Sequence, residues 1–151
     1  MNDMQPIETK YNGIVYRSRL EARWAMYFES LPCSFYYEPE GFNFGSVWYL
    51  PDFQVIFPVW KGLEGAWEIY VEIKPTGGVS DEAIKKCELL CNNYGGNVIL
   101  LEGFPAEHIA YFFVPGKKFE KIKNWFVGDK SGKLAESAAK CTHYQFGRAK
   151  S

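Results

Sequence analysis

Apolar residues in the first part of the chain recur at the spacing of one helix face. Ser18, followed three residues later by Glu21, has the form of a capping box, and Pro32 is a residue that stops a helix. The pattern predicts a helix at about residues 18–31 with Ser18 as its N-cap. The positions expected on its buried face are Leu20, Trp24, Tyr27, Phe28 and Leu31.

Short apolar runs predict the strands that follow this helix. The clearest strand is at 67–74, where apolar residues alternate strictly with Glu, Tyr and Lys. Because alternate side chains point to opposite faces of a sheet, Glu68, Glu72 and Lys74 share one face of this strand. Further strands are predicted at 35–37, 42–44, 47–57, 98–101 and 110–114, with a break or bend in the third near Pro51.

A second helix is predicted between the strands at 67–74 and 98–101. Its expected range is about 80–93, with Ser80 as N-cap and an apolar stripe behind it. A strand, a helix and a strand in this order form a βαβ unit with a right-handed parallel crossover. The expected order is therefore a helix, several strands, a helix, two strands and a last short helix at 134–141.

The bulk composition fits one compact α/β domain over residues 1–151. Residues 1–10 are expected to be a loose lead-in, 58–66 a glycine-containing loop and 142–151 a polar tail. The net charge of −1 argues against a general basic surface for nucleic acid, although an acidic site can offset a local basic surface. No stretch has the pattern of a membrane span or a signal peptide, so we expect a cytoplasmic protein with reduced cysteines.

Three polar residues on neighbouring predicted strands form a candidate catalytic set. Glu72 and Lys74 share a face of one strand, and Asp52 lies in the strand before it, across a loop that would close a hairpin. If these strands pair, the two carboxylates approach each other, and they repel unless a cation lies between them. Oxygen ligands favour Mg²⁺ or Mn²⁺. Such an ion polarises a phosphoryl oxygen, and Lys74 can orient or deprotonate an attacking water.

Glu21 is a fourth candidate, because it falls at the margin of the apolar face of the first helix, beside Phe28. A carboxylate there can reach the sheet and assist a metal through water. The surrounding arginines, Arg17, Arg19 and Arg23, are candidate contacts to nucleic-acid phosphates. Because Arg19 and Arg23 fall on the outer side of the helix, a plain solvated face is an equally good interpretation.

Four segments resemble the PD-(D/E)xK nuclease superfamily, and more narrowly small phage and prophage proteins of endonuclease type. They are RSRLEARWA at 17–25, YEPEGF at 37–42, YLPDF at 49–53 and VEIK at 71–74. The site logic is similar to that of Tn7-type transposase end-cleaving subunits and Holliday-junction resolvases. Each motif alone is common, whereas their order and strand context are moderately specific. Pro75, directly after Lys74, departs from the pattern at the end of the strand.

This resemblance implies a restriction-endonuclease-like fold, an αβββαβ core in which helices flank a mixed central sheet. It implies an active site of Glu21, Asp52, Glu72 and Lys74, in which the three carboxylates and the carbonyl of Ile73 bind Mg²⁺ or Mn²⁺. The implied substrate is duplex or branched DNA, cut to 5′-phosphate and 3′-hydroxyl ends by a phage or mobile-element protein. Because one site cuts one strand, a homodimer is a further expectation for double-strand cleavage.

Plainer interpretations stand beside this one. Glu21 has a structural role as a capping-box member, and Asp52 after a proline fits a turn. Glu72 and Lys74 fit a solvated strand face that Glu68 shares. The chain would then be a catalytically silent module that binds nucleic acid or a host protein.

Two other groups of residues have competing explanations. Core packing explains the tryptophans better than base stacking does. The tryptophans concerned are Trp48, Trp60 and Trp67. A Cys₃His zinc site would use Cys87, Cys91, Cys141 and His143. Buried free thiols are the simpler interpretation of the two helix cysteines, because they lie on the apolar stripe.

Overall fold

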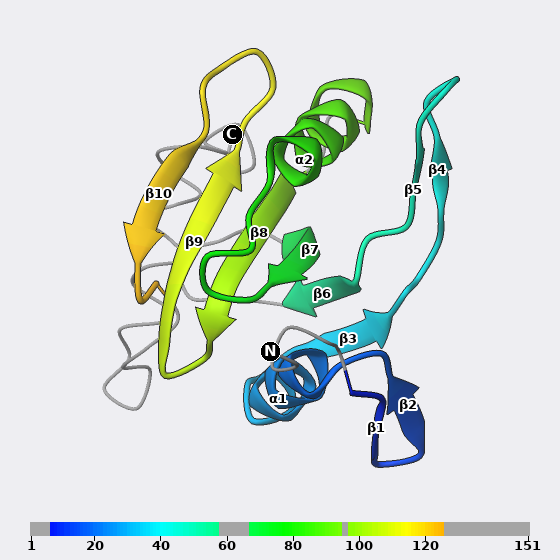
Figure 1. Cartoon of the computed structure of the whole chain (residues 1–151), viewed down its shortest axis with the longest axis vertical. Coiled ribbons are helices and arrows are strands. Elements are labelled where there is room, and N and C mark those ends of the chain that lie inside the picture. The colour runs from blue at the N-terminus through cyan, green and yellow to red at the C-terminus, as the bar shows by residue number, and fades with distance from the viewer. Residues whose placement is uncertain (1–6, 58–66, 95–96, 126–151) are drawn as a thin grey trace.

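A mixed six-stranded sheet forms the centre of the fold in the computed structural model (Figure 1). The structure describes residues 7–57, 67–94 and 97–125. In spatial order the strands are β10 (Glu120–Lys123), β9 (Glu107–Phe113), β8 (Asn97–Phe104), β7 (Trp67–Lys74), β6 (Phe53–Phe57) and β3 (Ser34–Tyr37). Strands β7 and β8 pair in parallel, and the other neighbours are antiparallel.

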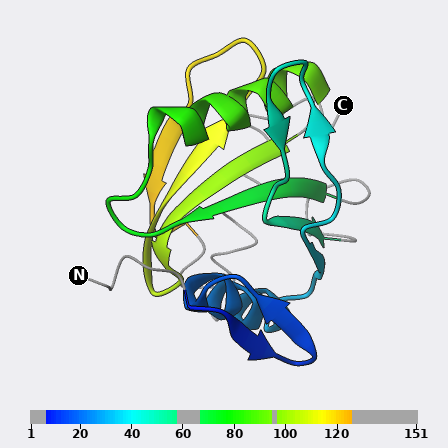
Figure 2. The same cartoon turned by 45° about the vertical axis from the view of Figure 1, so that its right-hand side comes forward.

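Two helices cover opposite faces of this sheet, as Figure 2 shows. Helix α1 (Arg19–Glu29) packs on the face that carries Val71 and Ile73, and helix α2 (Asp81–Tyr94) packs on the face that carries Tyr70. Because side chains alternate along β7, this strand contributes residues to two apolar layers, one on each side of the sheet. The order α1, β3, β6, β7, α2, β8 confirms the predicted αβββαβ core with a mixed sheet between helices.

Helix α1 begins where the sequence predicts. The Oγ of Ser18 accepts a hydrogen bond from the Glu21 N–H at 3.1 Å, as an N-cap does. The Glu21 carboxylate in turn accepts from the backbone N–H of Arg17, one residue before the cap. On the buried face, the indole N–H of Trp24 donates to the carbonyl of Gly103 at 2.8 Å, which ties α1 to the end of β8.

The other elements predicted within the described residues are also found. The strands predicted at 35–37, 98–101 and 110–114 are β3, β8 and β9, and the second helix is α2, in which Ser80 Oγ accepts from the Ala83 N–H at 3.1 Å. The region 47–57 is divided as expected near its proline, into β5 (Trp48–Tyr49) and β6. Strand β5 pairs with β4 (Phe42–Asn43) in a small hairpin apart from the main sheet.

The sequence interpretation overlooked two elements. Strands β1 (Thr9–Tyr11) and β2 (Ile14–Tyr16) form a hairpin, so Thr9 and Lys10 belong to a strand and the predicted lead-in over residues 1–10 is too long. Its turn is Asn12-Gly13, with φ values of 51° and 85°, a dipeptide that favours tight hairpins. Strand β10 extends the sheet beyond β9.

Several predictions fall outside the described residues, namely the loop at 58–66, the helix at 134–141 and the tail at 142–151. The extent of the single domain stays a prediction for the same reason. Within the described ranges, no helix combines the length and the apolar character needed to cross a membrane.

The buried hydrogen bond of Trp24 generates a stability prediction. Trp24→Phe removes the donor to the Gly103 carbonyl and leaves this acceptor without that partner, so it should lower the free energy of unfolding by about 1–3 kcal/mol. Chemical denaturation measures the loss. Met26→Ala on the exposed side of the same helix is the control and should change stability by less than about 0.5 kcal/mol. Equal losses in both variants would contradict the role given to this bond.

Candidate active site

The pairing of β6 with β7 brings Asp52 beside Glu72. The antiparallel ladder runs from Phe57 opposite Trp67 to Phe53 opposite Val71, and Asp52 directly precedes Phe53. Its Oδ2 accepts a hydrogen bond from the backbone N–H of Ile73 at 2.7 Å. Asp52 lies in a bend directly before β6, as a turn residue does, and at 3% exposed it is also a buried link between the strands.

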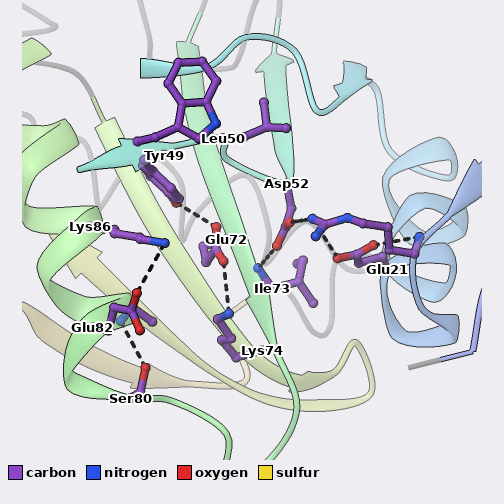
Figure 3. A pocket seen from close by; sticks show the side chains of 13 residues that line it. Glu21, Tyr49, Leu50, Asp52, Glu72, Ile73, Lys74, Ser80, Glu82 and Lys86 are labelled. Atoms are coloured by element: carbon purple, nitrogen blue, oxygen red, sulfur yellow. Dashed lines mark hydrogen bonds and ion pairs between the residues drawn. The ribbon is translucent and has the colours of Figure 1, made fainter. Parts of the chain in front are cut away.

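A pocket of about 350 Å³ opens at this point, and all four predicted residues line it (Figure 3). Asp52, Glu72 and Lys74 come from the sheet, and Glu21 comes from the first turn of α1. The structure therefore brings together four positions that are spread over more than fifty residues of sequence. The exposed fractions of the three carboxylate residues are 7% for Glu21, 3% for Asp52 and 8% for Glu72.

Glu72 is held from both sides. The hydroxyl of Tyr49 donates to its Oε1 at 2.7 Å, and the ammonium group of Lys74 lies 3.3 Å from its Oε2 (Figure 3). Glu68 is on the same face of β7 but is exposed. The solvated-face interpretation thus fits Glu68 and is wrong for Glu72, because the end of this face is covered.

Arg17 lies among the acidic residues. Its guanidinium group is 2.8 Å from Asp52 Oδ1, 2.7 Å from Glu38 Oε2 and 3.6 Å from Glu21 Oε2. Glu38 follows the end of β3 with a φ of 47°, a left-handed conformation that is unusual outside glycine. The charge of Arg17 balances the carboxylates of the pocket, and its predicted contact with nucleic acid stays a prediction.

The other two predicted arginines lie away from these carboxylates. Arg19 and Arg23 are exposed on α1, and the Arg23 guanidinium sits 5.1 Å from the centre of the Phe104 ring. Their predicted contact with nucleic acid is compatible with this exposure and stays a prediction.

Glu21 is fixed by its neighbours. The Tyr37 hydroxyl donates to its Oε1 at 2.6 Å, and this oxygen also accepts from the Arg17 backbone N–H at 3.2 Å. Arg17 therefore bridges Glu21 and Asp52. The capping role and a role in the pocket are both compatible with this geometry, because the helix start faces the end of the sheet.

Burial raises the pKa of Asp52 well above its ordinary value, and the neighbouring charges of Glu72 and Glu21 raise this pKa further. The pKa of Glu72 is also raised, chiefly by burial, although the Tyr49 hydrogen bond and the Lys74 charge oppose the shift. Burial and the nearby Glu72 likewise raise the pKa of Tyr49, which keeps its hydroxyl a donor. Two buried carboxylates in this situation favour a bound cation, which would stabilise both in the charged form.

Comparison with known proteins gives one structural likeness. No protein-family description matches the chain, and a search of curated proteins found no match. The structure is similar to that of Hjc, a Holliday junction resolvase from the archaeal hyperthermophile Archaeoglobus fulgidus. The TM-score is 0.42 and the sequence identity 13%, over 69% of this chain and 85% of that chain.

The donor set of the pocket fits a hard divalent cation. In the described part of the chain, no three Asp, Glu, His or Cys residues are grouped as a ready-made metal cage. Mg²⁺ does not require one, because it keeps several waters and is commonly held by one or two carboxylates. Asp52 and Glu72 offer carboxylate oxygens of that kind, and Ile73, whose carbonyl is the further predicted ligand, lines the same pocket.

The cysteines of the described residues do not form a metal-binding group. Cys87 and Cys91 are buried in the α2 layer, and the Cys87 thiol lies 3.9 Å from the Tyr49 hydroxyl. Their burial agrees with the simpler interpretation as core thiols. Cys141 and His143, the other two predicted zinc ligands, lie outside the described residues.

Sequence reasoning gave no role to several residues that shape the site. Tyr37, Glu38 and Tyr49 stood inside the motif segments but were not singled out as contacts of Glu21, Arg17 and Glu72. Their place next to the Pro-containing motifs was the available signal. Lys86 of α2, which lines the opposite wall and lies 3.6 Å from Glu82, had no signal of its own.

The raised pKa of Glu72 predicts a pH-dependent effect on stability. A carboxyl group whose folded pKa exceeds its unfolded pKa binds more protons when folded, so stability falls as pH rises through that interval. At pH 8 and without divalent metal, Glu72→Gln should therefore stabilise the fold by about 0.5–2 kcal/mol. The gain should vanish toward pH 4. Thermal unfolding at several pH values measures the difference.

Glu68→Gln is the matched control, since it removes a charge from the same face of the same strand at an exposed position. It should show no comparable pH-dependent gain. A Glu72→Gln protein that is less stable than wild type at pH 8 would contradict the electrostatic account of the pocket.

Proposed function

We propose that this protein is a metal-dependent nuclease of the PD-(D/E)xK type that hydrolyses DNA phosphodiester bonds. The observation that carries the proposal is the pairing of two buried carboxylates, Asp52 and Glu72, with a lysine ammonium group 3.3 Å from one of them. A structural ion pair alone does not require the second buried carboxylate, whose presence raises the pKa of the first. A divalent cation would give both carboxylates a role, because the ion can take an oxygen ligand from each.

In this proposal Asp52, Glu72 and the Ile73 carbonyl hold Mg²⁺ or Mn²⁺, and Glu21 assists through water. The ion supplies Lewis-acid stabilisation of the phosphoryl oxygens. Tyr49 keeps one Glu72 oxygen oriented through its hydrogen bond.

Lys74 adds a positive charge at the edge of the same pocket, next to the Glu72 carboxylate. In the reaction it would orient the attacking water and stabilise the negative charge that develops on the phosphate. Its side chain is 32% exposed, so a substrate can reach it.

A cleavage assay tests the proposal. Wild-type protein should cut DNA in Mg²⁺ or Mn²⁺ and not in EDTA, and Asp52→Ala and Lys74→Ala should each lower the rate at least about 100-fold. Duplex, single-stranded and branched DNA are compared, with 5′-phosphate and 3′-hydroxyl ends expected. Glu68→Ala is the matched control and should retain the wild-type rate. Cleavage that survives both active-site substitutions would reject the assignment.

A second function is a binding module for nucleic acid or a host protein, without catalysis. The observation in its favour is that Arg17 already balances the charge of Asp52, Glu21 and Glu38. Calorimetric titration with Mg²⁺ separates the two functions. Heat of binding that Asp52→Ala abolishes supports the nuclease, and absence of binding supports the module. The expectations of a phage or mobile-element origin, a cytoplasmic location and a homodimer accompany the first function.

A further inference from the structure

The rim of the pocket carries an exposed indole ring. Trp48 lines the same pocket as Asp52 and Glu72, and at 62% exposed it is the most exposed large apolar side chain in the described ranges. The core-packing interpretation is therefore wrong for Trp48. It holds for Trp67, which is 3% exposed, and Trp60 lies outside the described residues.

The Trp48 ring packs against the backbone of a glycine. A Cβ atom added at Gly41 would lie 2.2 Å from two carbon atoms of the indole, so the ring rests directly on the Gly41 backbone. Any larger residue at 41 would push the ring away. Gly41 thus leaves room for the Trp48 ring, which is otherwise exposed to solvent.

The hairpin that carries this ring is anchored to the sheet and to α2 (Figure 2). Phe42 contacts the rings of Tyr70 and Tyr94, with centroid distances of 5.4 and 4.9 Å. The Tyr70 hydroxyl also donates to Glu40 at 2.6 Å. Because these contacts hold β4, and β4 pairs with β5, the position of Trp48 relative to the pocket is set by packing.

The chain order couples the ring to the carboxylates. Tyr49, the next residue, is 4% exposed and donates to Glu72. Side chains alternate along a strand, so Tyr49 points into the pocket floor while Trp48 points outward. The Trp48 ring is therefore carried by the residue next to Tyr49, whose hydroxyl orients Glu72.

The chemistry around the ring identifies a ligand class. Burying so large an apolar side chain is favourable, and its exposure beside a charged pocket suits a flat, partly polar ligand. Every nucleobase presents a π-face that stacks on an aromatic ring, independent of sequence. Lys86 on the α2 wall of the same pocket adds a cation for a neighbouring phosphate.

We propose that Trp48 stacks an unpaired nucleobase next to the phosphodiester bond that is cut, and so directs the protein to single-stranded or displaced nucleotides. Bases inside a duplex are already stacked on their neighbours and cannot offer a free face without being extruded. The proposal rests on the nuclease function for the cut itself, whereas the stacking contact can be measured separately as binding.

The test measures binding in EDTA, where no cleavage is expected. Fluorescence anisotropy follows three labelled DNAs, which are a full duplex, a duplex with a short single-stranded flap, and the same flap made of abasic nucleotides. Trp48→Ala should weaken binding of the flap DNA about tenfold or more, and should leave the duplex and the abasic flap almost unchanged. Trp48→Phe, which keeps a stacking ring, should retain most of the affinity.

Tyr36→Ala is the matched control, because Tyr36 is a 53% exposed aromatic residue on the edge strand β3. This substitution should not change the binding affinity for any of the three DNAs. Wild-type protein that binds flap and abasic flap equally, or binds neither, would overturn the proposal. So would a Trp48→Ala loss that is equal for all three DNAs, or a Trp48→Phe loss as large as that of Trp48→Ala.

The cleavage reaction distinguishes this failure from failure of the proposed function. If the stacking contact is wrong but the nuclease is right, Trp48→Ala cuts flap DNA as wild type does and Asp52→Ala does not. If the proposed nuclease function is wrong, neither the wild type nor Trp48→Ala shows cleavage that the Asp52→Ala substitution abolishes. The binding series in EDTA still reports on Trp48.

Discussion

The hydrogen bond from the Ile73 N–H to the Asp52 carboxylate is the interaction on which the pocket depends. The backbone ladder between β6 and β7 ends at Phe53 opposite Val71, and the chain bends at Asp52, directly before this pair. Beyond that point a side chain, not the backbone, receives the N–H of β7. This places a buried carboxylate between the ends of two interior strands of the sheet.

The charge of the pocket follows from that placement. Burial raises the pKa of both Asp52 and Glu72, and the charge of Glu72 raises the pKa of Asp52 further. The fold offsets the cost with Arg17 on one side and Lys74 on the other. Paired and hydrogen-bonded charges of this kind are tolerated inside proteins, whereas a lone buried carboxylate costs several kcal/mol. The site therefore combines positive charges that stabilise the fold with buried carboxylates that the proposed function uses as ligands of a divalent cation.

Much of this arrangement could be predicted from sequence because it follows local rules. The cap at Ser18, the alternation along β7 and the break at Pro51 each specify an element and its direction. Once the elements are correct, the antiparallel pairing of β6 and β7 brings Asp52 to Glu72 without further information. The Asn12-Gly13 hairpin also follows such a rule, and it was missed because its strands are only three residues long.

What the sequence could not specify depends on contacts between distant segments. Arg17 looks like one member of an arginine cluster, but its guanidinium turns toward Glu38 and Asp52, which are 21 and 35 positions further along. Trp48 and Trp67 are identical as residues, and burial of one and exposure of the other depend on what covers each strand. Pattern rules describe periodicity along a strand and carry no information about which segment packs over it.

The difference between Glu68 and Glu72 shows how the fold converts a repeated pattern into chemistry. Both lie on the same face of β7, one is exposed and the other is 8% exposed, and the change occurs over four residues. The pocket at the end of β7 is also lined by Tyr49, by residues of α2 and by Glu21 in the first turn of α1. Burial raises the pKa of Glu72, and the Tyr49 hydroxyl fixes its orientation. The same residue type at Glu68 has neither constraint, so one strand face carries a buried, oriented carboxylate at one position and an exposed carboxylate at the other.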